Sequence, residues 1–138
     1  MMKKLRFIFA LVLMLIVMVG CSDQSFTESS TQNPVYESET AGISIKSDTL
    51  TNEGMTLIIS NKTDSELNYG MDYYIEKKDG ENWLTYNGTV SFTEIAGVID
   101  PEGEVDFELD FPVKLSAGDY RIIKSVGGES LALDFTIS

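Results

Sequence analysis

Alternation of large apolar with polar side chains, from Ala41 to the end of the chain, is the feature that most limits the possible fold. The clearest run is residues 104–111, in which Val105, Phe107, Leu109 and Phe111 alternate with Glu104, Asp106, Glu108 and Asp110. A period of two residues is typical of β-strands with one buried face. No stretch after Gly20 has the spacing of an amphipathic helix, so we predict an all-β domain over residues 41–138.

Turn signals divide this domain into seven or eight short strands. We expect strands at residues 42–46, 55–60, 73–78, 83–86, 104–111, 120–126 and 131–137, with a weaker run within 89–98. Asp79-Gly80 and Gly127-Gly128 mark hairpin turns. Many short strands with such spacing favour an antiparallel sandwich or barrel, and a domain of this length is large enough to fold without disulfides.

A different kind of sequence precedes the domain. Lys3, Lys4 and Arg6 are followed by a short apolar stretch that runs from Phe7 to Gly20 and ends at Cys21. A basic segment followed by a short apolar one is typical of an export signal, whereas a membrane-spanning helix needs about 20 apolar residues. Residues 1–20 are therefore expected to be a signal peptide. An uncleaved signal anchor and a soluble secreted protein are the alternatives.

Cys21 is the only cysteine of the chain, so no disulfide can form within one molecule. The stretch Met18-Val19-Gly20-Cys21 resembles a lipobox, the bacterial lipoprotein signal, in which the cysteine sulfur receives a diacylglycerol and becomes the mature N-terminus. Two long acyl chains make such anchoring stable. The resemblance implies a lipoprotein at the extracytoplasmic face of the cell membrane, with membrane lipid as its partner through acylated Cys21.

Residues 21–40 are expected to be the lipidated cysteine followed by a disordered linker. They are rich in Ser and Thr, and their few large apolar side chains cannot build a core. A flexible linker of this length has a reach on the order of 25 Å. The composition thus predicts a spacer between the bilayer and the domain.

The charge of the chain excludes one class of partner. Removal of residues 1–20 takes away three cations and no anions, so the net charge changes from −12 to −15. Binding of nucleic acid requires clustered Lys and Arg to neutralise phosphates. We therefore expect no nucleic-acid partner.

The residues that usually carry catalysis are scarce. The chain has no His, its one thiol is expected to be acylated, and its serines follow no G-x-S-x-G pattern. Carboxylates can act as an acid and base pair, but no spacing singles out one pair among the 22 acidic residues. We predict neither an enzyme nor a cofactor.

An acidic run from Glu102 to Asp110 has two interpretations. Ca²⁺ prefers several oxygen ligands, so the run is a candidate calcium site or a candidate binding surface for a cationic partner. It is equally the composition of a solvated outer face whose charges discourage pairing with other sheets. A straight strand cannot wrap its carboxylates around one ion, so we favour the solvated face and predict no metal.

The stretch from Lys114 to Ile122 resembles the loop that enters the sixth strand of immunoglobulin-like sandwiches, where a tyrosine corner forms. There Leu115 would plug the core, Gly118 would permit the turn, and the Tyr120 hydroxyl would bond back to the main chain. Further segments carry the resemblance in order: Leu57–Asn61, Tyr69-Gly70, Tyr74–Lys77, the Gly80-to-Trp83 spacing and Tyr120–Lys124.

Through these segments residues 50–137 resemble a bacterial Ig-like domain family of Gram-positive surface lipoproteins. The resemblance implies an immunoglobulin-like antiparallel β-sandwich and a cell-surface setting. It implies no reaction or ligand. The chain lacks the paired cysteines of antibody domains, and Trp83 follows the Asp79-Gly80 turn, so it is not an antibody-type domain.

Four aromatic residues form a candidate binding surface: Tyr69, Tyr74, Trp83 and Tyr86. On a period of two, Tyr73 lies on the face opposite Tyr74, so one of these neighbours must point away from the core. Exposed Tyr and Trp are favoured in recognition surfaces. The alternative is that Trp83 and Tyr73 fill the core while Tyr74 and Tyr86 cover cross-strand neighbours.

Three functions are consistent with this sequence. The leading one is a membrane-anchored, non-catalytic interaction module that binds an envelope protein or a cell-wall partner. The second is a protease inhibitor, since the chain loosely resembles the Ig-like intracellular proteinase inhibitor family of bacilli, and residues 61–70 or 87–97 would supply the inhibitory loop. The third is a passive spacer in an envelope complex.

Overall fold

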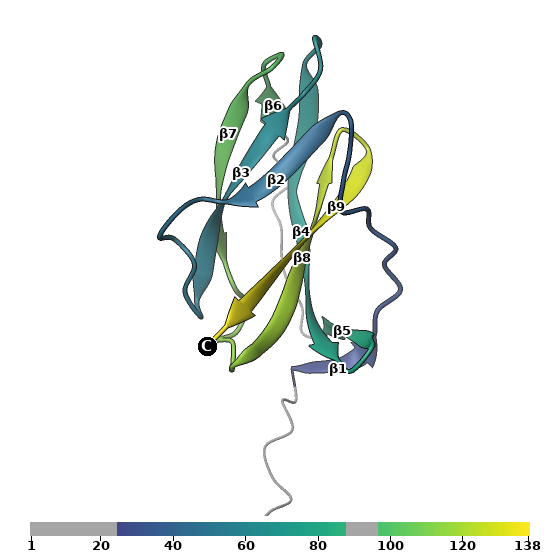
Figure 1. The fold of residues 1–138 in the computed structure, drawn as a ribbon, viewed down its shortest axis with the longest axis vertical. Helices are drawn as coiled ribbons and strands as arrows, with labels where there is room; N and C mark the ends of the chain where they lie inside the picture. Colours follow the sequence, from purple (N-terminus) through teal and green to yellow (C-terminus); the bar gives the residue numbers. More distant parts are fainter. Residues whose placement is uncertain (1–24, 88–96) are drawn as a thin grey trace, which may run out of the picture.

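Two antiparallel sheets pack face to face in the computed structural model, which describes residues 25–87 and 97–138 (Figure 1). The larger sheet has the order β1 (Phe26–Ser29), β5 (Asn82–Tyr86), β4 (Leu67–Asp79), β8 (Gly118–Val126) and β9 (Glu129–Ile137), and β6 (Gly97–Ile99) also pairs with β4. The smaller sheet has the order β2 (Ala41–Ile45), β3 (Gly54–Asn61) and β7 (Glu104–Asp110). The prediction of an all-β, Ig-like sandwich is confirmed.

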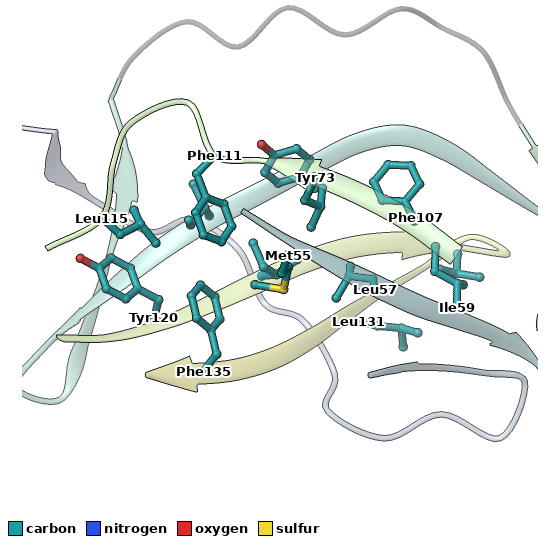
Figure 2. Close-up of a cluster of buried hydrophobic side chains, with 14 of the residues drawn as sticks. Met55, Leu57, Ile59, Tyr73, Phe107, Phe111, Leu115, Tyr120, Leu131 and Phe135 are labelled. Carbon is teal, nitrogen blue, oxygen red and sulfur yellow. The ribbon is translucent and has the colours of Figure 1, made fainter. Parts of the chain in front are cut away.

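The alternating pattern of the sequence builds the core between the sheets. Along β3, Met55, Leu57 and Ile59 are at most 4% exposed, whereas the residues between them are partly exposed. Their side chains lie opposite those of the larger sheet, among them Leu131 and Phe135 (Figure 2). Burial of each such side chain contributes roughly 1.5–3 kcal/mol, so the core holds the two sheets together.

Both predicted hairpins are present. Asp79 pairs with Asn82 across the β4–β5 turn, and Val126 pairs with Glu129 across the β8–β9 turn. A two-residue hairpin turn requires positive φ, which glycine adopts without steric cost. Gly80 has a φ of 62°, and Gly127 and Gly128 have φ values of 58° and 84°, so glycine in these turns sets the register of each strand pair.

Tyr120 makes the contacts of a tyrosine corner. Its ring is fully buried, and its hydroxyl donates a hydrogen bond of 2.8 Å to the main-chain carbonyl of Ser116. The ring stacks on Phe135, with 5.6 Å between centroids, and Leu115 in the preceding loop is 3% exposed. At Gly118 a Cβ atom would lie 3.2 Å from the Cε atom of Lys77, so a larger residue there would require that flexible side chain to shift by a few tenths of an ångström.

The structureless linker predicted for residues 21–40 is not what the structure shows for residues 26–29. These residues form β1, which pairs with β5, and Phe26 is only 2% exposed. The Phe26 ring packs edge-on against Tyr120 at 5.7 Å and against Tyr86 at 5.8 Å. The linker prediction rests on the high average polarity of residues 21–40. One buried side chain, Phe26, attaches the segment to the domain but hardly changes that average.

The strand β4 is longer than predicted and contains an irregularity. It begins at Leu67 rather than near Tyr73, and its register with β8 shifts between Tyr69 and Tyr73. The ammonium group of Lys124 lies beside this register shift. It donates to the main-chain carbonyl of Asp72 at 2.7 Å and to that of Gly70.

Lys124 is fully buried, and its nitrogen lies 4.7 Å from the centre of the Phe107 ring. Burial lowers the pKa of Lys124, and the charge of Asp72 opposes that shift in part. The lysine therefore satisfies carbonyls that the irregular strand leaves without ladder partners.

Candidate functional site

The structure does not bring the four predicted aromatic residues together. Tyr69 and Tyr86 face the interior, where the Tyr69 ring lies 6.1 Å from that of Phe107. Tyr74 is 47% exposed on the outer face of the larger sheet. Trp83 pairs with Lys78 across β4 and β5, and so lies on the same outer face. Both interpretations are thus partly wrong, since Trp83 does not fill the core and only Tyr74 and Trp83 share a surface.

An ion pair between Glu76 and Arg121 lies at the centre of this outer face. The two residues are directly opposite each other on β4 and β8, and they are 0% and 6% exposed. Arg121 donates from Nε and Nη2 to the Glu76 Oε1 atom, at 2.8 and 2.6 Å. The other carboxylate oxygen, Oε2, is buried and has no hydrogen-bond partner among the described residues. A buried charge needs its partner, so this pair fixes both side chains.

Trp83 packs over the guanidinium of Arg121. The Arg121 Cζ atom lies 4.4 Å from the ring centre, and the Lys78 nitrogen lies 5.9 Å from it. An Arg–Trp contact of this kind contributes about 0.5–2 kcal/mol. The strand register places the side chains of Trp83, Lys78 and Arg121 on one face. Lys78 is opposite Trp83, and Glu76, which lies two residues before Lys78 on β4, is opposite Arg121.

Tyr36 completes the group from outside the predicted domain. Its segment runs alongside β9, where the Val35 amide donates to Ser130 O at 2.9 Å and the Ala132 amide donates to Val35 O at 2.8 Å. The Tyr36 hydroxyl accepts a bond of 3.4 Å from Arg121 Nη1, and Tyr36 is 53% exposed. We call Tyr36, Tyr74, Glu76, Trp83 and Arg121 the outer-face cluster.

Tyr36 could not be predicted as a site residue because it lies in the segment whose composition predicts a linker. The available signal was the pair Val35-Tyr36, two large apolar residues within a polar stretch. The same signal marked Phe26. Phe26 and Tyr36 both contact the sandwich, so a large apolar side chain within the polar N-terminal segment marks a point where that segment attaches to the domain.

Both titratable groups that meet at Tyr36 keep their usual protonation states at neutral pH. Burial raises the pKa of Tyr36, and the nearby charge of Asp134 raises it further, while the bond from Arg121 opposes the shift. Burial would lower the pKa of Arg121, but its bonds to Tyr36 and Glu76 outweigh that effect and raise the pKa above its usual value. The phenol thus stays neutral and the guanidinium charged at neutral pH.

The surface beside the cluster is shallow. A depression of about 170 Å³ lies next to Trp83 and is lined also by Lys78, Asp119, Asp134 and Thr136. Pockets for drug-sized ligands are typically about 300–1,000 Å³. This part of the surface therefore suits contact with a macromolecule better than enclosure of a small molecule.

The acidic run is displayed on the outer face of β7. Glu104, Asp106, Glu108 and Asp110 are all exposed, and Asp106 accepts a bond of 2.6 Å from Lys46, which is itself half-exposed. Within residues 25–87 and 97–138, no three His, Cys, Asp or Glu side chains are grouped so that they would hold a metal ion. The described geometry therefore gives no support to the calcium interpretation.

The remaining predicted sites have different outcomes. Cys21 lies outside the described residues. In the first candidate inhibitory loop, Asn61 ends β3 and residues 67–70 begin β4, so residues 62–66 alone form a loop. Residues 88–96 of the second candidate loop also lie outside the described part of the chain. No helix within the described part has the length and apolar character to cross a membrane.

The two packed sheets and the tyrosine corner define an immunoglobulin-like β-sandwich. The family model for the bacterial Ig-like domain matches residues 37–137. The chain belongs to this bacterial Ig-like domain family. No curated protein and no solved structure matched the chain. The family match begins after β1 and Tyr36, so these two attachments of the N-terminal segment lie outside it.

Proposed function

We propose that this protein is a lipid-anchored, extracytoplasmic, non-catalytic interaction module that binds a protein of the cell envelope through the outer-face cluster. Membrane attachment rests on Cys21 and the apolar stretch before it. Binding rests on one observation. Two half-exposed tyrosines, Tyr36 and Tyr74, lie on the sheet face that also carries the Arg121–Trp83 contact.

The composition of the cluster supports a protein partner. Tyr, Trp and Arg are the residues that most often dominate binding energy in protein interfaces. Tyrosine offers a large contact area with few rotatable bonds, so its ordering costs little entropy. The buried ion pair holds Arg121, and Arg121 in turn contacts Tyr36 and Trp83. The surface is therefore organised before a partner arrives.

The anchor is tested by fractionation of cells that produce the wild-type protein or Cys21→Ala, with Ser22→Ala as a matched control. The wild type and the control should be in the membrane fraction with a diacylglyceryl mass on Cys21. The Cys21→Ala protein should be released or remain unprocessed. If Cys21→Ala stays membrane-bound at the mature mass, the anchor proposal is wrong, and a mass that retains residues 1–20 in the wild type would indicate a signal anchor.

The binding surface is tested by site-specific photo-cross-linking in native membranes. A photoreactive residue replaces Tyr36, Tyr74 or, as a control on the opposite sheet, the exposed Ser44. Positions 36 and 74 should capture the same envelope protein, and position 44 should not. For that partner, Tyr74→Ala should weaken binding at least tenfold, which corresponds to about 1.4 kcal/mol. Equal capture at all three positions, or unchanged affinity, would contradict the proposal.

A further inference from the structure

The attachment of β1 to the sandwich leaves a very short tether. Phe26 is buried between Tyr86 and Tyr120, and it lies only five residues after Cys21 in the sequence. Five residues span at most about 18 Å when fully extended. The 13 residues of β4 run the length of the sandwich, about 43 Å at 3.3 Å per residue. The tether is therefore much shorter than the domain.

The two ends of the sandwich differ in their distance from this tether. The end that we call the anchor end carries β1, β5, the β4–β5 turn and residues 111–117 (Figure 1). The other, which we call the far end, carries residues 62–66, residues 100–103 and the β8–β9 turn. Main-chain bonds tie these segments together and to β4, since Glu102 donates to Thr63 O and Gly127, in the β8–β9 turn, donates to Asn68 O near the start of β4.

Charge differs between the ends in the described residues. At the anchor end, Lys77, Lys78 and Lys114 lie among six acidic residues: Glu28, Glu53, Asp79, Glu81, Asp110 and Asp119. Among the described residues, the far end has one lysine, Lys62, and seven acidic residues, so its net charge is more negative: Glu39, Asp64, Glu66, Asp100, Glu102, Glu104 and Glu129. Anionic lipid attracts lysines near its surface and repels carboxylates within about a Debye length.

We propose that the anchor end of the sandwich lies against the bilayer surface and that the far end points away from it. This inference rests on the lipid anchor proposed above and adds a fixed orientation. The short tether keeps the anchor end within about 18 Å of the lipid, the length of five fully extended residues. The carboxylates of the far end oppose a flat orientation, in which that end would also meet the headgroups. Trp83 of the outer-face cluster then lies at the anchor end with β5, whereas Tyr36 and Tyr74 stand at the side of the domain, open to a neighbouring envelope protein.

Energy transfer to labelled lipid tests the orientation. The full-length lipidated protein is reconstituted in phosphatidylcholine vesicles that contain phosphatidylglycerol and an acceptor dye on the headgroups. A donor dye is attached to a single cysteine introduced by Glu81→Cys at the anchor end or Asp64→Cys at the far end, both exposed positions. Transfer should be several-fold stronger from position 81. Equal transfer from both positions would overturn the proposed orientation.

A second variant separates the tether from the anchor. Insertion of a Gly/Ser segment of about 20 residues after Gln24, with a flexible reach of about 25 Å, should reduce transfer from position 81 while the protein still floats with the vesicles. Unchanged transfer would show that the short tether does not hold the anchor end at the surface and would overturn the inference. Loss of flotation in the unmodified protein would instead refute the lipid anchor, and the orientation with it.

Discussion

At the scale of single residues, Tyr73 gives the stability of the domain a dependence on alkaline pH. Its hydroxyl donates to Asp110 O at 2.7 Å, and burial, with the charge of Asp110, raises its pKa to about 12. The free tyrosine has a pKa near 10, so the unfolded chain loses this proton first as pH rises. The contribution that the neutral Tyr73 phenol makes to the free energy of unfolding is therefore complete below about pH 10, and it is lost as the pH rises from about 10 through 12.

We therefore expect the wild type to lose about 2 kcal/mol more of its free energy of unfolding between pH 10 and 12 than Tyr73→Phe does. Denaturant titrations of both proteins at the two pH values measure this difference. Other tyrosines and lysines titrate in both proteins, so they cancel in the comparison. Equal losses in the two proteins would show that Tyr73 is not the group responsible.

Asn61 is a second residue on which stability should depend. It is 2% exposed, and its amide nitrogen donates to the carbonyls of Ser65, Ile99 and Asp100 at 2.7–3.1 Å. Its oxygen accepts from the amide and the hydroxyl of Thr63. This one side chain therefore joins the end of β3 to the segments that follow β6 and precede β4.

Asn61→Ala should lower the free energy of unfolding by about 2–3 kcal/mol, because it leaves several buried polar groups without partners. Asn68→Ala, at an exposed position of β4, serves as a control and should change stability by less than about 0.5 kcal/mol. Thermal or denaturant unfolding gives both values. Similar small effects at the two positions would mean that water replaces the Asn61 bonds.

At the scale of elements, the Glu76–Arg121 pair joins β4 to β8 in the centre of the larger sheet. Glu76→Met or Arg121→Met alone should cost about 3–5 kcal/mol, since each leaves a buried charge without its partner. The double variant should be much closer to the wild type than the sum of the two losses. A double-mutant cycle measures this coupling, and simple additivity would indicate that the pair contributes no specific interaction.

The strand β1 contributes to the core through one side chain. Phe26→Ala should destabilise the domain by about 3–5 kcal/mol, because it removes a ring that fills space between Tyr86 and Tyr120. Glu28→Ala, on the exposed side of the same strand, should have little effect. If Phe26→Ala has as little effect as the control, β1 is only loosely attached to β5.

Local patterns predicted most elements, and long-range contacts account for the failures. The runs around Leu57, Phe107 and Phe135 alternate in the sequence itself, so their strands and buried faces could be predicted. The side on which Trp83 lies depends on the register with β4, and the burial of Lys124 depends on the register shift in that strand. Neither the orientation of Trp83 nor the burial of Lys124 is determined by residues that are close to it in the sequence. The partners of Tyr36 are likewise far away in the sequence.

At the scale of the whole molecule, the N-terminal segment connects the fold to both proposals. Phe26 sets the length of the tether, and Tyr36 supplies an exposed side chain of the outer-face cluster. A fragment that begins at residue 37 would match the family model but lack both contacts. The central structural claim is therefore that residues 26–36 are an ordered part of the sandwich.

Hydrogen exchange of individual amides in the protein from residue 22 to residue 138 tests this claim most directly. The Ser30 amide donates to Trp83 O, and the Val35 amide donates to Ser130 O, both at 2.9 Å. Exchange at these two amides should be slowed to a degree comparable with that of strand amides in β5 and β9. Exchange of Ser30 and Val35 at the rate of an unstructured chain, with β8 and β9 still protected, would contradict the account.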